Sequence, residues 1–168
     1  HPAVTDPSLL GQLLVAVDKY MKRGSIITCY ALRILPHIFV RPSDLRFAKW
    51  SDVDLDNATW SFTPAKTETK MGTQLIVPLS QQILKLFKEL NMITGNNEYC
   101  FATYQGDSPV LSESTMNKAL KNLGWENGET TGHGFRATAR TLLDEVLRFP
   151  IERIEQQLGH QVRDMHGR

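Results

Sequence analysis

The sequence predicts a mostly α-helical domain with a small antiparallel β-sheet, which is an α+β fold. Apolar residues recur at helical spacing in several segments, and two short segments of strand-forming residues lie together in the middle of the chain. The sequence shows no internal repeats, linkers or low-complexity tracts, and its 168 residues are a usual length for one domain. We therefore expect residues 1–168 to form a single domain around one core.

Three helices are expected in the first part of the chain. Asp6 precedes a proline and an apolar stripe, so it predicts the cap of a helix that runs to about Met21. Residues 26–40 carry a continuous apolar face and predict a buried helix, which Pro36 should kink or interrupt. Residues 42–45 begin with a proline and include an acidic side chain, which is typical of the first turn of a third helix.

The middle of the chain predicts a β-hairpin or meander. Residues 59–63 and 74–77 are short and β-prone, and the polar stretch 66–72 separates them. Helical spacing resumes at Ser80. Further helices are expected at residues 112–123, with Ser112 as the cap, at 135–147 and at 151–158.

Composition excludes several classes of protein. No segment approaches the roughly 18 consecutive apolar residues that a membrane span needs, so we expect a soluble protein. Cys29 and Cys100 form no Cys-x-x-Cys pair, which argues against a disulfide framework or a thiolate zinc site and favours a reducing compartment. The net charge is only +1, so charge alone does not indicate nucleic-acid binding. No secretory signal begins at His1, and we expect other residues to precede it in the whole protein.

The segment 130–136 is the most informative stretch for chemistry. Two threonines and two glycines lead directly into an apolar helix, with His133 at its start and Arg136 in its first turn. The first turn of a helix presents unpaired amide donors that favour anions, so these two side chains suit a phosphate site. Their spacing of three residues puts them on neighbouring surface. A capped helix with a solvated arginine is the alternative interpretation.

Three further polar residues have structural alternatives of the same kind. Arg41 follows a buried apolar run, so its guanidinium is held near the core and needs an anionic partner, which Asp44 could supply. Lys70 lies in the expected hairpin, where a lysine is commonly a solvated edge charge. His160 follows a glycine that ends a helix, and a histidine there is commonly structural.

Taken together, these residues resemble the active site of the tyrosine site-specific recombinases. The resemblance rests on the order and spacing of Arg41, Lys70, His133, Arg136 and His160. The surrounding sequence matches as well, in Arg41-Pro42-Ser43-Asp44-Leu45-Arg46, Trp50-Ser51-Asp52-Val53-Asp54-Leu55, Val77-Pro78-Leu79, His133-Gly134-Phe135-Arg136 and Gln157-Leu158-Gly159-His160. The likeness covers essentially the whole chain, and residues 131–137 are especially similar to integrases of satellite phages and genomic islands.

The resemblance implies the tyrosine recombinase catalytic-domain fold and an enzyme that integrates or excises a mobile element such as a prophage. In that family a tyrosine attacks phosphorus and replaces the DNA phosphodiester bond by a 3′-phosphotyrosine ester. Rejoining reverses this exchange, so no metal or other cofactor is required. Arg41 and Arg136 would hold the non-bridging oxygens through forked donors. His133 and His160 would add hydrogen bonds to the transition state.

Lys70 is the general acid that the resemblance implies, because it occupies the hairpin shortly before the Val-Pro-Leu strand end. Lys66 lies in the same loop and could serve instead. The implied partners are double-stranded DNA at attachment sites, sister subunits of a tetramer, and accessory DNA-bending or directionality factors. The implied location is the bacterial cytoplasm, near the nucleoid. We expect the five side chains to converge on one concave, positively charged surface.

The nucleophile is the main departure from the family pattern. The family's tyrosine follows the last histidine, and this sequence ends at Arg168 without one, so we expect both the tyrosine segment and an N-terminal core-binding domain to be absent from the chain. The four tyrosines that are present, Tyr20, Tyr30, Tyr99 and Tyr104, precede His133 and should serve the framework.

Several alternatives remain at this point. A type IB topoisomerase uses nearly the same catalytic set, and a non-catalytic DNA-binding module would retain the same surface. Residues 52–56 alternate carboxylates as a calcium loop does, but the expected glycine and bidentate glutamate are missing, which favours a polar strand edge or turn. His160 and His166 have no neighbouring zinc-ligand motif.

Overall fold

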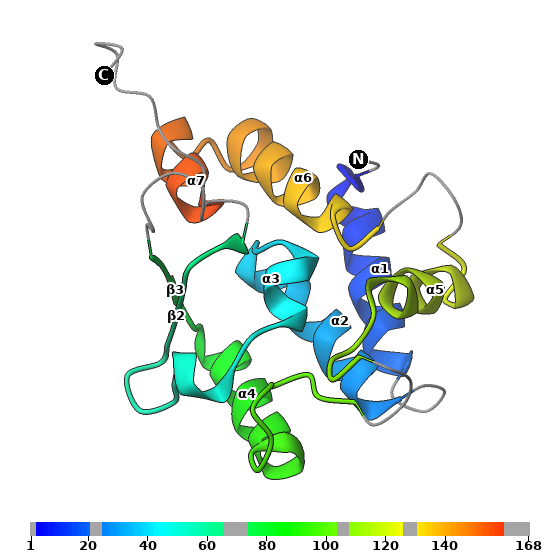
Figure 1. The fold of residues 1–168 in the computed structure, drawn as a ribbon. Coiled ribbons are helices and arrows are strands. Elements are labelled where there is room, and N and C mark those ends of the chain that lie inside the picture. The colour runs from blue at the N-terminus through cyan, green and yellow to red at the C-terminus, as the bar shows by residue number, and fades with distance from the viewer. Residues whose placement is uncertain (1–2, 21–24, 66–73, 104–107, 126–130, 160–168) are drawn as a thin grey trace.

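A computed structural model describes residues 3–20, 25–65, 74–103, 108–125 and 131–159, which form a mostly helical fold with a small sheet, as expected. Helices and strands are arranged as shown in Figure 1. In chain order the elements are α1 (Pro7–Lys19), α2 (Ile26–Ile38), α3 (Pro42–Arg46), the 3₁₀ turn η2 (Trp50–Asp52), β1 (Val53–Asp54), β2 (Thr59–Phe62), β3 (Leu75–Pro78), α4 (Gln81–Thr94), α5 (Glu113–Asn122), α6 (Gly134–Thr141), the π-helical turn η4 (Leu142–Val146) and α7 (Ile151–Gln157).

Helix α2 lies at the centre of the helical part of the fold. It packs against α1, α3, α4, α5 and α6. Nine of its residues are buried, including Thr28 and Cys29, so the helix is covered on most sides. A helix that is apolar over most of its circumference has to be buried in this way. The other helices therefore use α2 as their common packing surface.

Pro36 does not interrupt α2, so that part of the expectation is wrong. The helix continues through Pro36 to Ile38 and ends at Phe39, which adopts the left-handed conformation with a φ of 55°. A proline removes one backbone donor and disturbs the preceding turn. Only two helical residues follow Pro36, so few hydrogen bonds depend on the turn that it disturbs.

Helix caps lie where the sequence predicts them. The Asp6 carboxylate accepts hydrogen bonds from the backbone amides of Ser8 at 2.7 Å and Leu9 at 3.1 Å. The Ser112 hydroxyl accepts one from the Thr115 amide at 3.1 Å. Each cap satisfies amides that have no partner inside the helix.

The predicted hairpin is confirmed and gains a short third strand. Strands β1, β2 and β3 follow one another in an antiparallel sheet, with Trp60 opposite Val53 on one side and Val77 on the other. Trp60 is fully buried and stacks on Phe62 at 4.2 Å between ring centroids. Trp60 therefore anchors the sheet to the core, and the sheet lies at one side of the helices in Figure 1.

The C-terminal helices depart from the expected single helix at residues 135–147. The α-helical part ends at Thr141, and Leu142–Val146 continue as a π-helical turn. Arg148 then adopts a left-handed conformation with a φ of 57°, and the chain turns into α7. Figure 1 shows α6 and α7 side by side, above α3.

The structure bears on two of the composition arguments. None of the helices within the described ranges is both long enough and apolar enough to cross a membrane. Cys29 and Cys100 are both buried, and no disulfide joins them.

Candidate active site

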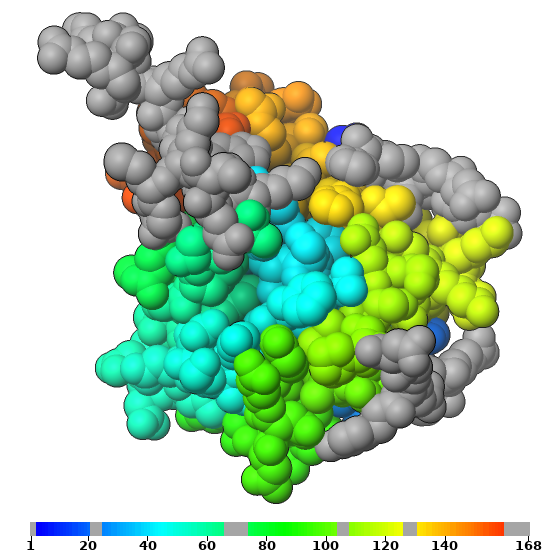
Figure 2. Space-filling model, viewed as in Figure 1, coloured from blue at the N-terminus to red at the C-terminus, as the bar shows by residue number. Residues whose placement is uncertain are grey.

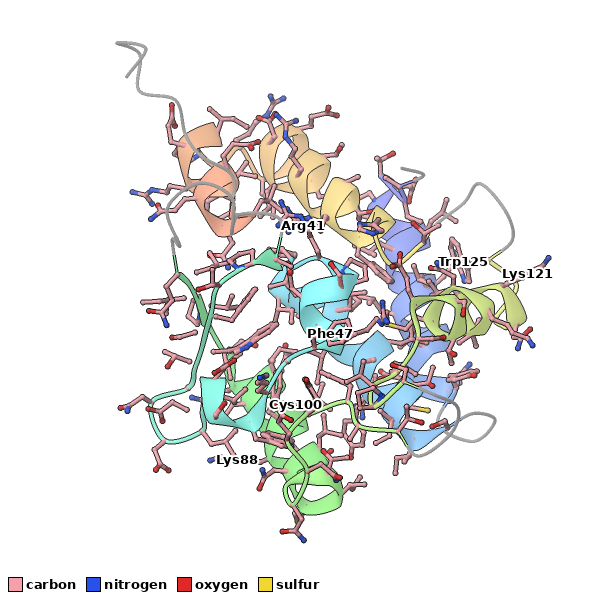
Figure 3. All side chains as sticks on the ribbon, in the orientation of Figure 1. Arg41, Phe47, Lys88, Cys100, Lys121 and Trp125 are labelled. Carbon is pink, nitrogen blue, oxygen red and sulfur yellow. The ribbon has the colours of Figure 1, made fainter. Side chains whose placement is uncertain are left out.

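Arg41 occupies the cap position of α3 and is held by the buried residues around it. Val40 before it and Pro42 after it are both buried, so the backbone at Arg41 lies against the core. Its side chain is 20% exposed, and its Nη1 lies 3.7 Å from Oδ2 of Asp44. Figure 3 shows Arg41 between α3 and α6. The ion pair that the structural alternative required is therefore present, although it is a loose one.

Arg136 joins two segments that are distant in sequence. Its Nη1 donates to the carbonyl oxygen of Phe39, and its Nη2 donates to the carbonyl oxygen of Leu158 at 2.8 Å. Phe39 lies two residues before Arg41, and Leu158 lies two residues before His160. The two bonds therefore bring the chain that carries Arg41 and the end of α7 to the first turn of α6.

The charges of Arg41, Asp44 and Arg136 act on one another. Burial, and to a smaller extent the positive charge of Arg41, lower the pKa of Arg136 to about 10. Burial raises the pKa of Asp44, whereas the charges of Arg41 and Arg136 oppose that rise. A pKa of about 10 keeps Arg136 protonated at neutral pH. The site thus contains two cations and one buried carboxyl group.

The turn before α6 is positioned by close packing and by hydrogen bonds. The Gly132 amide donates to Oδ1 of Asn117 at 3.1 Å, and the Gly134 amide donates to Oγ1 of Thr131 at 3.1 Å. A Cβ atom added at Gly132 would lie 3.1 Å from Cγ of Pro42, so the turn can approach α3 this closely only because the residue is glycine. The turn before α6 therefore packs closely against the start of α3.

His133 contacts an acidic residue that the sequence analysis did not single out. Its Nε2 lies 3.3 Å from Oε1 of Glu113, the first residue of α5. Acidic residues are common in the first turn of a helix, where they favour the helix dipole, so nothing in the sequence pointed to this pairing. Only the packing of α5 against the turn before α6 reveals it.

Two of the five predicted site residues, Lys70 and His160, lie outside the described residues, and so does Lys66. Their described neighbours lie close to the arginines. The backbone amide of Ala65, which precedes Lys66 and Lys70 in the sequence, donates to the Asp44 carboxylate. Gly159, which precedes His160, has a φ of 66°, and a Cβ added there would lie 3.1 Å from a methyl carbon of Leu75, which follows both lysines in the sequence.

The acidic segment 52–56 forms a turn. Oδ1 of Asp54 accepts from the amides of Asp56 at 3.0 Å and Asn57 at 2.8 Å, so this carboxylate is used within its own loop. The Asn57 side-chain amide also donates to Oδ2 of Asp54 at 2.8 Å, and this bond, together with the backbone bonds, lowers the pKa of Asp54. Over the described part of the chain, no three histidine, cysteine or acidic side chains gather as a metal site would require.

Comparison with known proteins identifies the family of this arrangement. Residues 5–167 match the phage integrase family. The chain belongs to the phage integrase family. Two relatives are the integrase of Enterobacteria phage P4, 38% identical over 154 residues, and the prophage integrase IntZ of Escherichia coli K12, 33% identical over 146 residues. These matches cover 84% and 87% of this chain but only 35% of each relative, so this integrase-family chain spans about a third of their length.

Solved structures of recombinases share the fold of this integrase-family chain. The crystal structure of XerA recombinase superposes with a TM-score of 0.72 at 20% identity, over 96% of this chain and 56% of that one. A lambda integrase (residues 75–356) dimer bound to a COC′ core site gives a TM-score of 0.68 at 19% identity, over 98% of this chain and 57% of that one. The tyrosine recombinase catalytic-domain fold expected from the sequence is therefore confirmed.

Proposed function

We propose that this chain is the catalytic domain of a site-specific recombinase that integrates or excises a mobile element. It cleaves and rejoins double-stranded DNA at attachment sites through a 3′-phosphotyrosine ester, without metal or cofactor. The observation that carries the proposal is the pair of hydrogen bonds from Arg136 to Phe39 and Leu158, which gathers three distant segments around two arginines. Membership of the phage integrase family supports the same activity.

The two arginines are proposed to bind the scissile phosphate. A guanidinium group binds phosphate oxygens through paired, charge-assisted hydrogen bonds. Two carbonyl oxygens orient Arg136, and a pKa of about 10 keeps it charged at neutral pH. Donors held in place before the reaction stabilise the charge that develops on phosphorus without further reorganisation. In the absence of DNA, the negative charge of the Asp44 carboxylate partly offsets the electrostatic repulsion between Arg41 and Arg136.

The remaining catalytic roles belong to His133, His160 and Lys70. His133 precedes the first turn of α6 and is proposed to donate a hydrogen bond to a phosphate oxygen, as is His160. Lys70 is proposed as the general acid for the departing 5′ oxygen, with Lys66 as the competing candidate. The contacts of Ala65 with Asp44 and of Gly159 with Leu75 support these assignments, because they join both flanking segments to the site.

The nucleophile is proposed to be a tyrosine outside residues 1–168, on a segment that follows His160 in the whole protein. Tyr20 and Tyr30 are buried, and burial raises the pKa of each phenol, which disfavours the phenolate. The Tyr30 hydroxyl also donates to Glu89 at 3.1 Å. The Tyr99 ring packs edge-on against Phe47. These three tyrosines serve the framework.

The working enzyme is proposed to contain more than this chain. A preceding core-binding domain would add further contacts with DNA. Four subunits would act on paired sites, together with accessory DNA-bending or directionality factors. The proposed location is the bacterial cytoplasm, at the nucleoid. A catalytic domain with a net charge of only +1 gains from such a second DNA-binding domain, because phosphate contacts supply most of the affinity.

A nicked suicide substrate tests the proposal. The full-length protein is expected to form a covalent 3′ adduct at its attachment site in the presence of EDTA, and Arg136→Ala should abolish the adduct. General relaxation of supercoiled DNA without site preference would indicate a topoisomerase instead. Binding without any adduct would indicate a DNA-binding module, and either result would overturn the proposed recombinase.

A further inference from the structure

Glu113 lies between a histidine and an arginine at the edge of the proposed active site. Its Oε1 is 3.3 Å from Nε2 of His133, and its Oε2 is 3.9 Å from Nη1 of Arg46. We propose that Glu113 is a positioning residue that holds the His133 ring in its working orientation and links it to α3. This inference rests on the proposed function, because it assigns a partner to one of the proposed catalytic side chains.

A carboxylate so close to a phosphate site needs a specific reason and a compensating charge. It would repel the DNA backbone if it were unpaired. Arg46 supplies the compensation, since its side chain is only 17% exposed and its guanidinium pairs with the Glu113 carboxylate. The pair therefore adds little net charge, and the two arginines of the site keep their positive field.

Arg46 is itself fixed, so the carboxylate is anchored to the core. Its Nε donates to the carbonyl oxygen of Leu111, and its guanidinium lies 5.3 Å from the centroid of the Phe47 ring. The Leu111 amide in turn donates to the carbonyl oxygen of the fully buried Phe101 at 3.0 Å. In Figure 2 the cyan surface of α3 lies between the sheet and the yellow-green surface of α5, where these contacts form.

Helix α5 holds the turn before α6 at two points. Glu113 contacts the His133 ring, and Asn117, four residues later on α5, binds the Gly132 amide at 3.1 Å. Residues four apart lie on the same face of a helix. Asn117 fixes the backbone of the turn, whereas Glu113 fixes the side chain that the turn presents. A carboxylate that accepts a hydrogen bond from Nε2 fixes the ring plane, and the hydrogen bond proposed from His133 to phosphate would then come from Nδ1–H of the doubly protonated ring.

The first test separates cleavage from DNA binding in the full-length protein. Glu113→Ala should slow single-turnover cleavage about tenfold to a hundredfold, the loss seen when a functional histidine at a metal site loses its supporting partner. The Kd for the attachment site should stay unchanged. Glu113→Gln should recover part of the rate, because its amide oxygen can still accept from Nε2. Glu98→Gln is the matched control, since Glu98 pairs with Lys49 at 2.9 Å, and it should cleave normally.

The second test asks whether Glu113 acts through His133. In a His133→Ala background, Glu113→Ala should have no further effect on cleavage. The imidazole ¹⁵N resonances of His133 should shift in Glu113→Ala and remain in place in Glu98→Gln, a readout that does not depend on activity.

The inference is overturned if Glu113→Ala cleaves like the parent, if it slows the His133→Ala variant as much as the parent, or if the His133 resonances do not move. A parent protein that forms no covalent adduct overturns the proposed function instead, and the resonances then still decide whether Glu113 orients His133.

Discussion

Nη2 of Arg136 donates to the carbonyl oxygen of Leu158 at 2.8 Å, across 22 residues of sequence and from one helix to the end of another. Its Nη1 donates to Phe39, 97 residues away. One partly buried side chain therefore connects α6, the end of α7 and the segment before α3. Any change at this position should affect stability and chemistry together.

Arg136→Lys should lower the free energy of unfolding by about 1–3 kcal/mol, because a lysine cannot bind two diverging carbonyls and leaves one buried acceptor unsatisfied. Denaturant unfolding followed by tryptophan fluorescence measures the loss. Arg140→Lys is the matched control on the same helix. Arg140 is half exposed and pairs with Glu155, so its replacement should cost at most about 1 kcal/mol. Equal losses for the two variants would contradict the bridging role of Arg136.

Asp44→Asn should change how stability depends on pH. Burial raises the pKa of Asp44 above its ordinary value of 3.8, so the folded state holds this proton more tightly than the unfolded state. The contribution of Asp44 is therefore fully present below about pH 3.8 and is lost as the pH rises through the folded-state pKa. The unfolding free energy of the parent should fall relative to Asp44→Asn over that window, as urea titrations at several pH values would show. If the parent instead gained stability relative to Asp44→Asn as the pH rises, the prediction would be wrong.

Two glycine substitutions should have opposite effects. Gly132→Ala would place a Cβ 3.1 Å from Cγ of Pro42, so the proline ring would have to shift by a few tenths of an ångström, and we expect the variant to lose about 1–3 kcal/mol of stability and to cleave DNA more slowly. Gly11→Ala meets nothing within 4 Å in the middle of α1, and it should stabilise the protein by about 0.5–1 kcal/mol. Thermal unfolding of both variants measures the two effects, and a neutral Gly132→Ala would show that Pro42 can shift without cost.

Lys70→Ala should slow cleavage of ordinary DNA in the full-length protein by about 10²–10⁴-fold, because a 5′ alkoxide leaves poorly without a proton. A substrate with sulfur at the bridging 5′ position has a better leaving group and should restore most of the rate. Arg136→Ala loses charge stabilisation and should not be rescued. If Lys66→Ala is rescued by sulfur and Lys70→Ala is not, Lys66 is the general acid.

DNA binding by the 168-residue chain should be weak, nearly independent of sequence and strongly dependent on salt. The logarithm of the affinity should fall with the logarithm of the salt concentration by about 0.9 for each phosphate contacted. Fluorescence anisotropy over a salt series measures the slope. An affinity that does not change with salt would contradict binding through phosphate contacts.

The sequence by itself determined the local elements and the family. The caps at Asp6 and Ser112 and the hairpin of β2 and β3 lie where they were expected, because each depends on neighbouring residues and their backbone preferences. The order and spacing of Arg41, His133 and Arg136 predicted them as candidate site residues. The interruption expected at Pro36 did not occur, since tertiary packing around α2 outweighs one lost donor near the end of a helix.

Only the tertiary structure decided how these side chains meet. The bonds of Arg136 to Phe39 and Leu158, and the contact of Glu113 with His133, join residues 20 to 97 positions apart. Such contacts depend on how whole helices pack around α2, and no local preference encodes that packing. A glutamate in the first turn of a helix is common, so the sequence around Glu113 does not distinguish it. Its position beside His133 follows from the way the helices pack.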